Sequence, residues 1–138
     1  MYNIKDLNEK LDILGQRMKL GEGTIKTEFV IPFLKRIGYT EKTCLYFYEY
    51  KCCEGRVDIY IELNDCNEGI YVAVKNGDVP VKNKDIKQIA KYLNDENIKW
   101  GILINGRKCY LLNREILSEK YVDNGDALLD KVVLTCDL

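Results

Sequence analysis

Residues 70–104 read IYVAVKNGDVPVKNKDIKQIAKYLNDENIKWGILI, and this stretch decides the fold class. It contains two apolar runs, 70–75 and 99–104, with the length and the β-branched content of strands. Between them, residues 83–96 have the spacing of an amphipathic helix, whose apolar face consists of Ile86, Ile89, Ala90 and Leu93. The order strand, helix, strand predicts a βαβ unit. Its two strands are expected to run parallel and to be joined by a right-handed crossover.

On the C-terminal side of this unit, Asn105-Gly106 is a strong hairpin signal. It predicts that the run 99–104 turns back into a further strand at 107–113. The tail has a weaker pattern, from which we expect a short helix near 124–130 and a last strand at 132–136.

On the N-terminal side, the residues at 44–51 and 56–62 predict two more strands, the first rich in aromatic side chains. Before them, apolar residues at three- and four-residue spacing predict helices at 3–19 and 24–37. Pro32 conflicts with the second helix, because a proline is tolerated only near a first turn or at a kink.

Together these elements predict an α/β fold with one mixed β-sheet, helices on both faces and an α-β-β-β-α-β core. A chain of 138 residues has the size of one domain. We therefore expect a single domain, 1–138, with an N-terminal helix at 1–20, a core at 24–113 and a C-terminal extension at 114–138.

The composition excludes several classes of function. There are 21 Lys and Arg residues against 22 Asp and Glu, so any nucleic-acid site must be a local patch. Histidine is absent, which removes Ser-His-Asp and Cys-His catalysis and, with no C-x-x-C motif, argues against zinc. The six cysteines are read as reduced, mostly packed thiols. No apolar run is long enough for a membrane helix, and the charged N-terminus MYNIKDLNEKLD is unlike a signal peptide, so we expect a cytoplasmic protein.

An aspartate interrupts the apolar pattern of RVDIYIE, residues 56–62. Alternation predicts that Val57, Ile59 and Ile61 share one face of the sheet, opposite the face of Asp58, Tyr60 and Glu62. In the next strand, Ala73 and Lys75 share a face. If the two strands pair, Asp58 and Lys75 meet at one end of the sheet. A buried aspartate needs a partner or a solvated cleft, and a structural salt bridge is the alternative to a catalytic role.

The helix at 83–96 carries polar residues that share one side, Asp85, Gln88 and Tyr92. Glu28 in the second helix is placed where it can point over the sheet. Taken alone, each of these side chains is an ordinary surface residue, and the tyrosine fits the core equally well.

The motifs, taken in order, resemble the PD-(D/E)xK nuclease superfamily, nearest to the nuclease domain at the N-terminus of type I restriction enzyme motor subunits. The resemblance covers about residues 24–113. It is carried by TEFVIPFLKRIGY (27–39), RVDI (56–59), VAVK (72–75), QIAKY (88–92) and WGILINGRKCYLL (100–112).

The resemblance implies roles for particular residues. Asp58 matches the first metal-binding aspartate, Lys75 the lysine of the (D/E)-x-K pair and Glu28 the helix glutamate. Gln88 and Tyr92 match the residues that brace the site. The implied cofactor is Mg²⁺, or Mn²⁺, held by Asp58, Glu28 and the backbone carbonyl of Val74.

The chain departs from the family pattern at Ala73, where the second metal-binding carboxylate is expected. Loss of that group is expected to lower the rate by roughly 100-fold or more. Three accounts are open: an engineered replacement of an acidic residue, a nuclease that has decayed naturally and is kept for binding, or a migrated carboxylate with Asp85 as the candidate.

The resemblance thus implies a Mg²⁺-dependent DNA endonuclease of the restriction type, impaired by Ala73. The alternative is an inactive nuclease-fold module that binds DNA or a protein partner. A domain this small would need a homo-oligomer, a dimer or tetramer, to cut both strands. The DNA contacts are assigned to lysines near the expected site, Lys26, Lys82, Lys84, Lys87 and Lys91; a solvated helix face is the ordinary reading of such a run.

Overall fold

The computed structural model describes residues 4–17, 19, 21–52, 55–64, 68–76, 80–105, 108–115 and 132–137. Its helical elements are α1 (Ile4–Arg17), α2 (Glu22–Ile25), the π-helical turn η1 (Lys26–Val30), α3 (Ile31–Arg36) and α4 (Asn83–Glu96). Its strands are β1 (Cys44–Cys52), β2 (Gly55–Leu63), β3 (Gly69–Val74), β4 (Trp100–Ile104), β5 (Lys108–Asn113) and β6 (Val132–Asp137). Each predicted strand is present, with ends within one residue of the prediction, and α4 has the predicted bounds.

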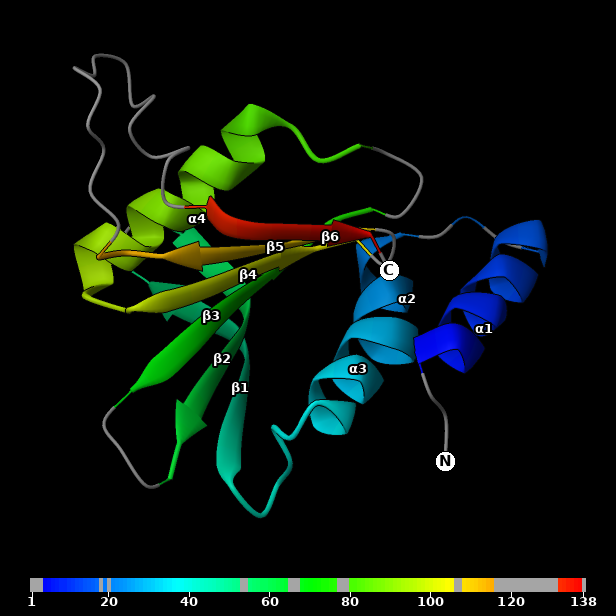
Figure 1. Ribbon diagram of the computed structural model, residues 1–138, viewed down its shortest axis with the longest axis horizontal. Helices are drawn as coiled ribbons and strands as arrows, with labels where there is room; N and C mark the ends of the chain where they lie inside the picture. Colours follow the sequence, from blue (N-terminus) through cyan, green and yellow to red (C-terminus); the bar gives the residue numbers. More distant parts are fainter. Residues whose placement is uncertain are drawn as a thin grey trace.

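The described strands form one six-stranded sheet in the order β1-β2-β3-β4-β5-β6 (Figure 1). β3 and β4 pair in parallel, with Val72 opposite Ile102, and the other neighbouring strands are antiparallel. The parallel pair confirms the βαβ unit, because only a crossover through α4 brings β4 alongside β3 in the same direction. The sheet is therefore mixed, as predicted.

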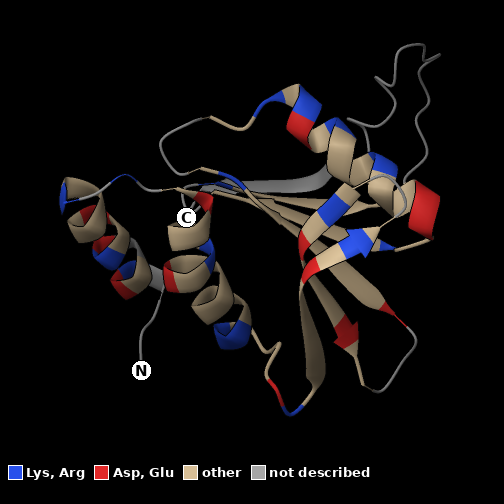
Figure 2. Cartoon of the chain, turned by 180° about the vertical axis from the view of Figure 1, so that it is seen from behind, with Lys and Arg blue, Asp and Glu red and all other residues tan. Residues whose placement is uncertain are grey.

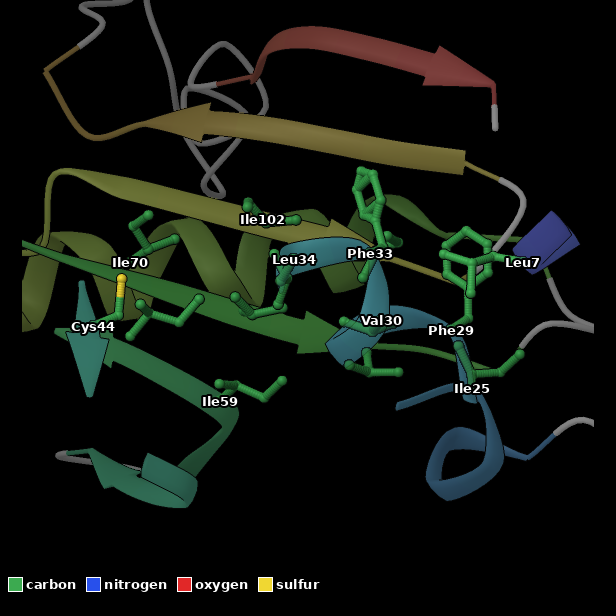
Figure 3. Packing of buried hydrophobic residues seen from close by; sticks show 14 of the residues in the cluster. Leu7, Ile25, Phe29, Val30, Phe33, Leu34, Cys44, Ile59, Ile70 and Ile102 are labelled. Atoms are coloured by element: carbon green, nitrogen blue, oxygen red, sulfur yellow. The ribbon is translucent and has the colours of Figure 1, made fainter. Parts of the chain in front are cut away.

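Helices cover both faces of the sheet. On the first face, which we call the α3 face, the helices from α1 to α3 pack against the sheet, and Phe29, Phe33 and Leu34 belong to one apolar cluster with Ile59 and Ile102 (Figure 3). On the other face, which we call the α4 face, α4 packs its apolar stripe against Tyr71, Leu103 and Leu112. The two apolar layers make this an α/β domain, and burial of these side chains is its main source of stability.

The predicted helix at 24–37 is not one continuous α-helix. It begins earlier, at Glu22, and is divided by η1 into α2 and α3. Pro32 lies in the first turn of α3, where its missing N–H is not needed. The π-helical turn ends at Val30, two residues before the proline, and such turns occur as single-turn bulges within α-helices.

The C-terminal part of the chain contributes to the sheet. β6 pairs with β5 in an antiparallel arrangement with an irregularity between Leu111 and Leu112. The segment predicted as an extension at 114–138 therefore supplies an edge strand. The helix predicted near 124–130 lies outside the described residues. Within the described part of the chain, no helix has the length and apolarity needed to cross a membrane.

Candidate active site

The alternation of β2 breaks at Asp58. Ile59 and Ile61 pack on the α3 face as expected, but Val57 packs on the α4 face, so the prediction that all three share a face is wrong. Continuing the register of β1 and β2 places Glu49 opposite Asp58, and Glu49 has a positive φ of 49°. A residue in this left-handed region rotates the strand sharply. The local twist of both strands therefore turns Asp58 away from the face that its position in the sequence predicts.

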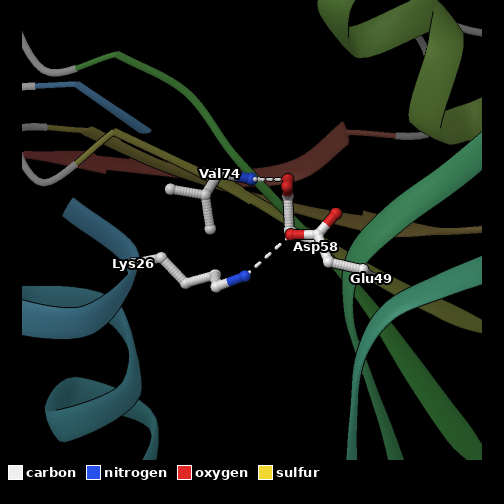
Figure 4. Close-up of polar contacts among 4 residues, drawn as sticks. All are labelled: Lys26, Glu49, Asp58 and Val74. Carbon is white, nitrogen blue, oxygen red and sulfur yellow. Dashed lines mark hydrogen bonds and ion pairs between the residues drawn. The ribbon is translucent and has the colours of Figure 1, made fainter. Parts of the chain in front are cut away.

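The carboxylate of Asp58 lies between β2 and β3. Backbone pairing of these strands runs from Glu62↔Gly69 to Ile59↔Val72. One residue further, Asp58 Oδ2 accepts a hydrogen bond of 2.6 Å from the backbone N–H of Val74 (Figure 4). The side chain thus takes the place of a backbone acceptor where the two strands part.

Burial raises the pKa of the Asp58 carboxyl, and the negative charges of Glu22 and Glu49 act in the same direction. The Val74 N–H and the Lys26 ammonium oppose the shift. The net effect favours the protonated acid, because desolvation of the carboxylate outweighs these two favourable interactions.

Lys26 is held by another acid. Its Nζ lies 2.8 Å from Glu49 Oε1 (Figure 4) and 5.8 Å from the centre of the Tyr48 ring. The lysine side chain is only 19% exposed. Lys26, which we predicted to contact DNA, therefore lies beside the candidate site as a partner of Glu49.

A small pocket of about 200 Å³ opens beside the end of β3. It is lined by Glu22, Lys75, Asn76, Pro80, Lys82, Lys84 and Asp85. Lys75 Nζ lies 3.8 Å from Asp85 Oδ1. Asp85 Oδ2 also accepts the backbone N–H of Lys82 at 3.0 Å, so this carboxylate closes the N-terminus of α4. The pocket combines three lysines with two acids at the junction of β3 and α4.

Of the predicted catalytic residues, Lys75 lines this pocket, and Asp58 and Ala73 do not. Three others lie further away. Glu28 points toward α1, where Lys10 Nζ is 2.5 Å from its Oε2. Gln88 is exposed on α4 and does not line the pocket. Tyr92 is buried in the core of the α4 face, and its hydroxyl lies over Gly55 at the start of β2. Asp58 thus lies within β2 and Lys75 directly follows the neighbouring strand β3, but Glu28, Gln88 and Tyr92 are not gathered around them.

Glu22 is the acidic residue that the sequence reasoning missed. It lines the pocket with Lys75 and lies close enough to Asp58 to raise the pKa of that carboxyl. The apolar spacing predicts a second helix that starts at 24, which leaves Glu22 in the preceding linker. Glu22 follows Gly21 directly, and an acidic residue in a first helical turn is typical of a helix start. This pattern could have predicted that the helix begins at Glu22.

Position 73 directly precedes Val74, whose backbone N–H donates to the Asp58 carboxylate. Continuing the register from Ile59↔Val72 places Ala73 opposite Asp58. Ala73 is half-buried and packs on the α4 face. In a strand, the N–H and C=O of one residue point toward the same neighbouring strand. The carbonyl of Val74 therefore faces the β2 side, as its N–H does.

The residues present do not make a Mg²⁺ site. Mg²⁺ prefers several oxygen ligands in octahedral geometry. Among the described residues, no group of three or more Asp, Glu or Cys side chains is placed to hold a metal ion. Alanine at 73 removes one carboxylate, and Asp85 is engaged by Lys75 and the Lys82 N–H. The donor set beside Asp58 is therefore incomplete.

One family model matches most of this chain, including the candidate site. The model of the family described as "Type I restriction enzyme R protein N terminus" matches residues 22–125. The chain belongs to this family. The match begins at Glu22 and includes β1 to β5 and α4, so the whole candidate site of this R-protein N-terminal domain lies within it.

A solved structure shares the fold of this R-protein N-terminal domain. It is titled "Characterization and crystal structure of the type IIG restriction endonuclease BpuSI", with a TM-score of 0.53 and 13% sequence identity. The similarity covers 76% of this chain and 12% of that one, so the chain spans a small part of that enzyme's length. No match was found among the curated proteins.

Proposed function

We propose that the chain is a DNA-directed domain of the restriction-nuclease type whose cutting centre lacks one carboxylate. It binds DNA at the mouth of the pocket beside β3, and it cleaves slowly or not at all as it stands. The observation that carries this proposal is the position of Ala73, opposite Asp58 and two residues before Lys75. The family and the shared fold support the nuclease part of the proposal.

The chain's own residues supply the DNA-binding part. Lys75, Lys82 and Lys84 all line the pocket, and lysines positioned in this way contact phosphate oxygens without reading the base sequence. Glu22 and Asp85 in the same pocket limit its net positive charge. Asp58 has a raised pKa and is a weaker metal ligand than a solvated carboxylate.

The decisive experiment restores the missing group. The variant Ala73→Glu places a carboxylate opposite Asp58, and we expect it to cut plasmid DNA in the presence of Mg²⁺ at least ~100-fold faster than the unaltered chain. The matched control is Ala73→Gln, which has the same size without the charge and is expected to stay inactive. Adding Asp58→Asn to Ala73→Glu is expected to remove the gained activity, because cleavage is expected to need both Asp58 and the carboxylate introduced at position 73.

Equal cleavage by Ala73→Glu and Ala73→Gln would refute the nuclease proposal. DNA binding by the unaltered chain, measured by fluorescence anisotropy with a labelled duplex and without metal, separates the two parts of the proposal. If Ala73→Glu is inactive but the duplex binds, the domain is a binding module.

Cleavage of both strands would also require two copies, so we propose a dimer or tetramer for the cutting form.

A second candidate is an active nuclease in which Asp85 replaces the missing acid. It is favoured by the position of Asp85, which is 17% exposed and 3.8 Å from Lys75 in the same pocket as Glu22. It predicts Mg²⁺-dependent cleavage by the unaltered chain, abolished by Asp85→Asn. An unaltered chain that does not cut removes this candidate.

A further inference from the structure

Two basic residues lie opposite each other near the end of the hairpin that β1 and β2 form. Lys51 of β1 and Arg56 of β2 are direct partners in this antiparallel pair, and both are exposed. Directly opposite residues of antiparallel strands interact on one face of the sheet, and like charges in such a pair are destabilising. The hairpin therefore keeps two cations close together against its own stability.

The nearest acids on the same strands do not neutralise this pair. Glu49 lies two residues before Lys51, and its carboxylate is bound by Lys26 at 2.8 Å. Asp58 lies two residues after Arg56, but it accepts a backbone N–H, and burial raises the pKa of its carboxyl. No salt bridge joins Lys51 or Arg56 to another described residue. The positive charge of the pair is therefore left for a partner outside this domain.

The acids at the end of α4 lie beside the opposite side of the hairpin. Burial raises the pKa of the Cys52 thiol, and the acids at the C-terminal end of α4 act in the same direction. Cys52 and Val57 both pack on the α4 face. Because neighbouring side chains of a strand point to opposite faces, Lys51 and Arg56 point away from that face. These α4 acids are thus on the wrong side to compensate the two cations.

The cation pair is close to the pocket along the strands. A strand rises about 3.3 Å per residue, so Arg56 lies about 7 Å along β2 from Asp58. Asp58 accepts the N–H of Val74, and the next residue, Lys75, lines the pocket. Duplex DNA carries one phosphate per strand for about every 3.4 Å of its axis. A duplex at the mouth of the pocket thus presents further phosphates within the distance that separates the hairpin from Asp58.

We propose that Lys51 and Arg56 hold backbone phosphates of the duplex bound at the pocket, as a second contact with the DNA. This inference rests on the proposed function, because it requires DNA at the pocket. A guanidinium binds phosphate through two parallel hydrogen bonds, and an ammonium acts as a point charge. Phosphate between the two side chains replaces their repulsion with attraction to a shared anion. The contact positions the duplex without reading its sequence.

The test measures binding of a fluorescently labelled duplex to the full chain by anisotropy, without metal and over a salt series. The double variant Lys51→Gln/Arg56→Gln is expected to bind several-fold more weakly. The slope of log K against log salt should fall by about 1–2, because one or two phosphate contacts are lost. Arg56→Lys keeps the charge and should keep the slope. The matched control is Lys42→Gln, in the exposed turn before β1, which should bind like the unaltered chain.

A second readout separates a DNA contact from a structural role. Because the two cations repel each other, the double variant without DNA should unfold at the same temperature as the unaltered chain or at a higher one. Any gain should shrink at high salt, since exposed charges are screened. Weaker binding together with a lower midpoint of thermal unfolding would assign the effect to a damaged hairpin and overturn the proposal.

The outcomes also distinguish this inference from the proposed function. If Lys84→Gln weakens binding and the hairpin double variant does not, the pocket binds DNA and the hairpin contact is overturned. If the unaltered chain binds no duplex even at low salt, both the DNA-binding function and the hairpin contact are overturned.

Discussion

The Asp58 carboxylate has a defined position between two strands, but its burial lowers the stability of the folded domain. This carboxylate is removed from water between two strands and is stabilised by one backbone N–H at 2.6 Å. Burial outweighs this hydrogen bond, so the pKa of the carboxyl is raised from its ordinary value of 3.8. A group kept at such a position against stability is more typical of a functional site than of a structural ion pair.

The substitution Asp58→Asn should therefore stabilise the domain near neutral pH. The native state binds a proton more tightly than the unfolded state, so stability falls as pH rises through the window between the unfolded and the folded pKa of Asp58. Below that window both states are protonated and the penalty is absent. The asparagine side chain keeps an oxygen acceptor for the Val74 N–H. The gain, measured by urea unfolding, should be largest near pH 7 and should vanish at about pH 3.

If Asp58→Asn is instead destabilising at neutral pH, the hydrogen bond to Val74 outweighs the desolvation of the carboxylate. Glu62→Gln on the same strand is the control, because Glu62 lies on β2 outside the contact with Val74. That control should not show the same pH-dependent gain.

At the scale of elements, the start of α4 links the pocket to the stability of the helix. Asp85 is the third residue of α4 and accepts the N–H of Lys82, which precedes the helix. It also faces Lys75 at the end of β3. The Asp85 carboxylate thus caps the N-terminus of α4 and forms an ion pair with Lys75 in the pocket.

Replacing this carboxylate should destabilise the domain. Asp85→Ala removes the acceptor for the Lys82 N–H and is expected to lower the free energy of unfolding by about 1 kcal/mol. Asn94→Ala, at an exposed position of the same helix, is the control and should be neutral or slightly stabilising. Equal effects of the two substitutions in chemical denaturation would show that the contact at the helix start adds nothing.

A second element-scale contact is the approach of α4 to the start of β2. A Cβ at Gly55 would overlap the hydroxyl of Tyr92 and lie 3.2 Å from its Cζ. Gly55→Ala should therefore cost about 1–3 kcal/mol of stability. Tyr92→Phe removes the overlapping oxygen and should recover part of this loss in the double variant. Gly23→Ala, which meets nothing within 4 Å, is the matched control; a loss of the same size there would contradict this explanation.

At the scale of the whole molecule, charge is distributed unevenly over a chain that is almost neutral. Figure 2 shows lysines along α4, with acidic residues near its two ends, on the opposite side of the sheet from α1. The pocket lysines Lys82 and Lys84 lie at the N-terminal end of this helix. Local placement, rather than net charge, is therefore what supports an interaction with DNA.

DNA affinity should depend steeply on salt, and Lys84 should contribute to that dependence. Lys84→Gln is expected to weaken duplex binding and to reduce the slope of log K against log salt by about 1, because one phosphate contact is lost. Lys5→Gln on α1 is the control, since the Lys5 side chain is 83% exposed and far along the chain from the pocket. Fluorescence anisotropy over a salt series gives the slopes. An unchanged slope in Lys84→Gln would remove this lysine from the interface.

The local pattern of the sequence determined the elements and most of their order in space. Periods of two and of 3.6 residues identify strands and helices, and the βαβ stretch 70–104 placed β3, α4 and β4 correctly, because these signals lie within single elements. The same logic predicts that β2 and β3 pair and that Asp58 and Lys75 meet at one end of the sheet. The two strands do pair, and Lys75 lines the pocket whereas Asp58 does not.

Only the tertiary structure decided which side chains meet. The twist at Glu49 and Asp58 moved Val57 to the other face, α1 engaged Glu28, and the earlier start of the second helix brought Glu22 to the pocket. These contacts depend on strand twist, helix register and the packing of elements that are distant in the chain. A pattern of hydrophobic and polar residues records the period of each element, but it does not record the angle at which two elements cross.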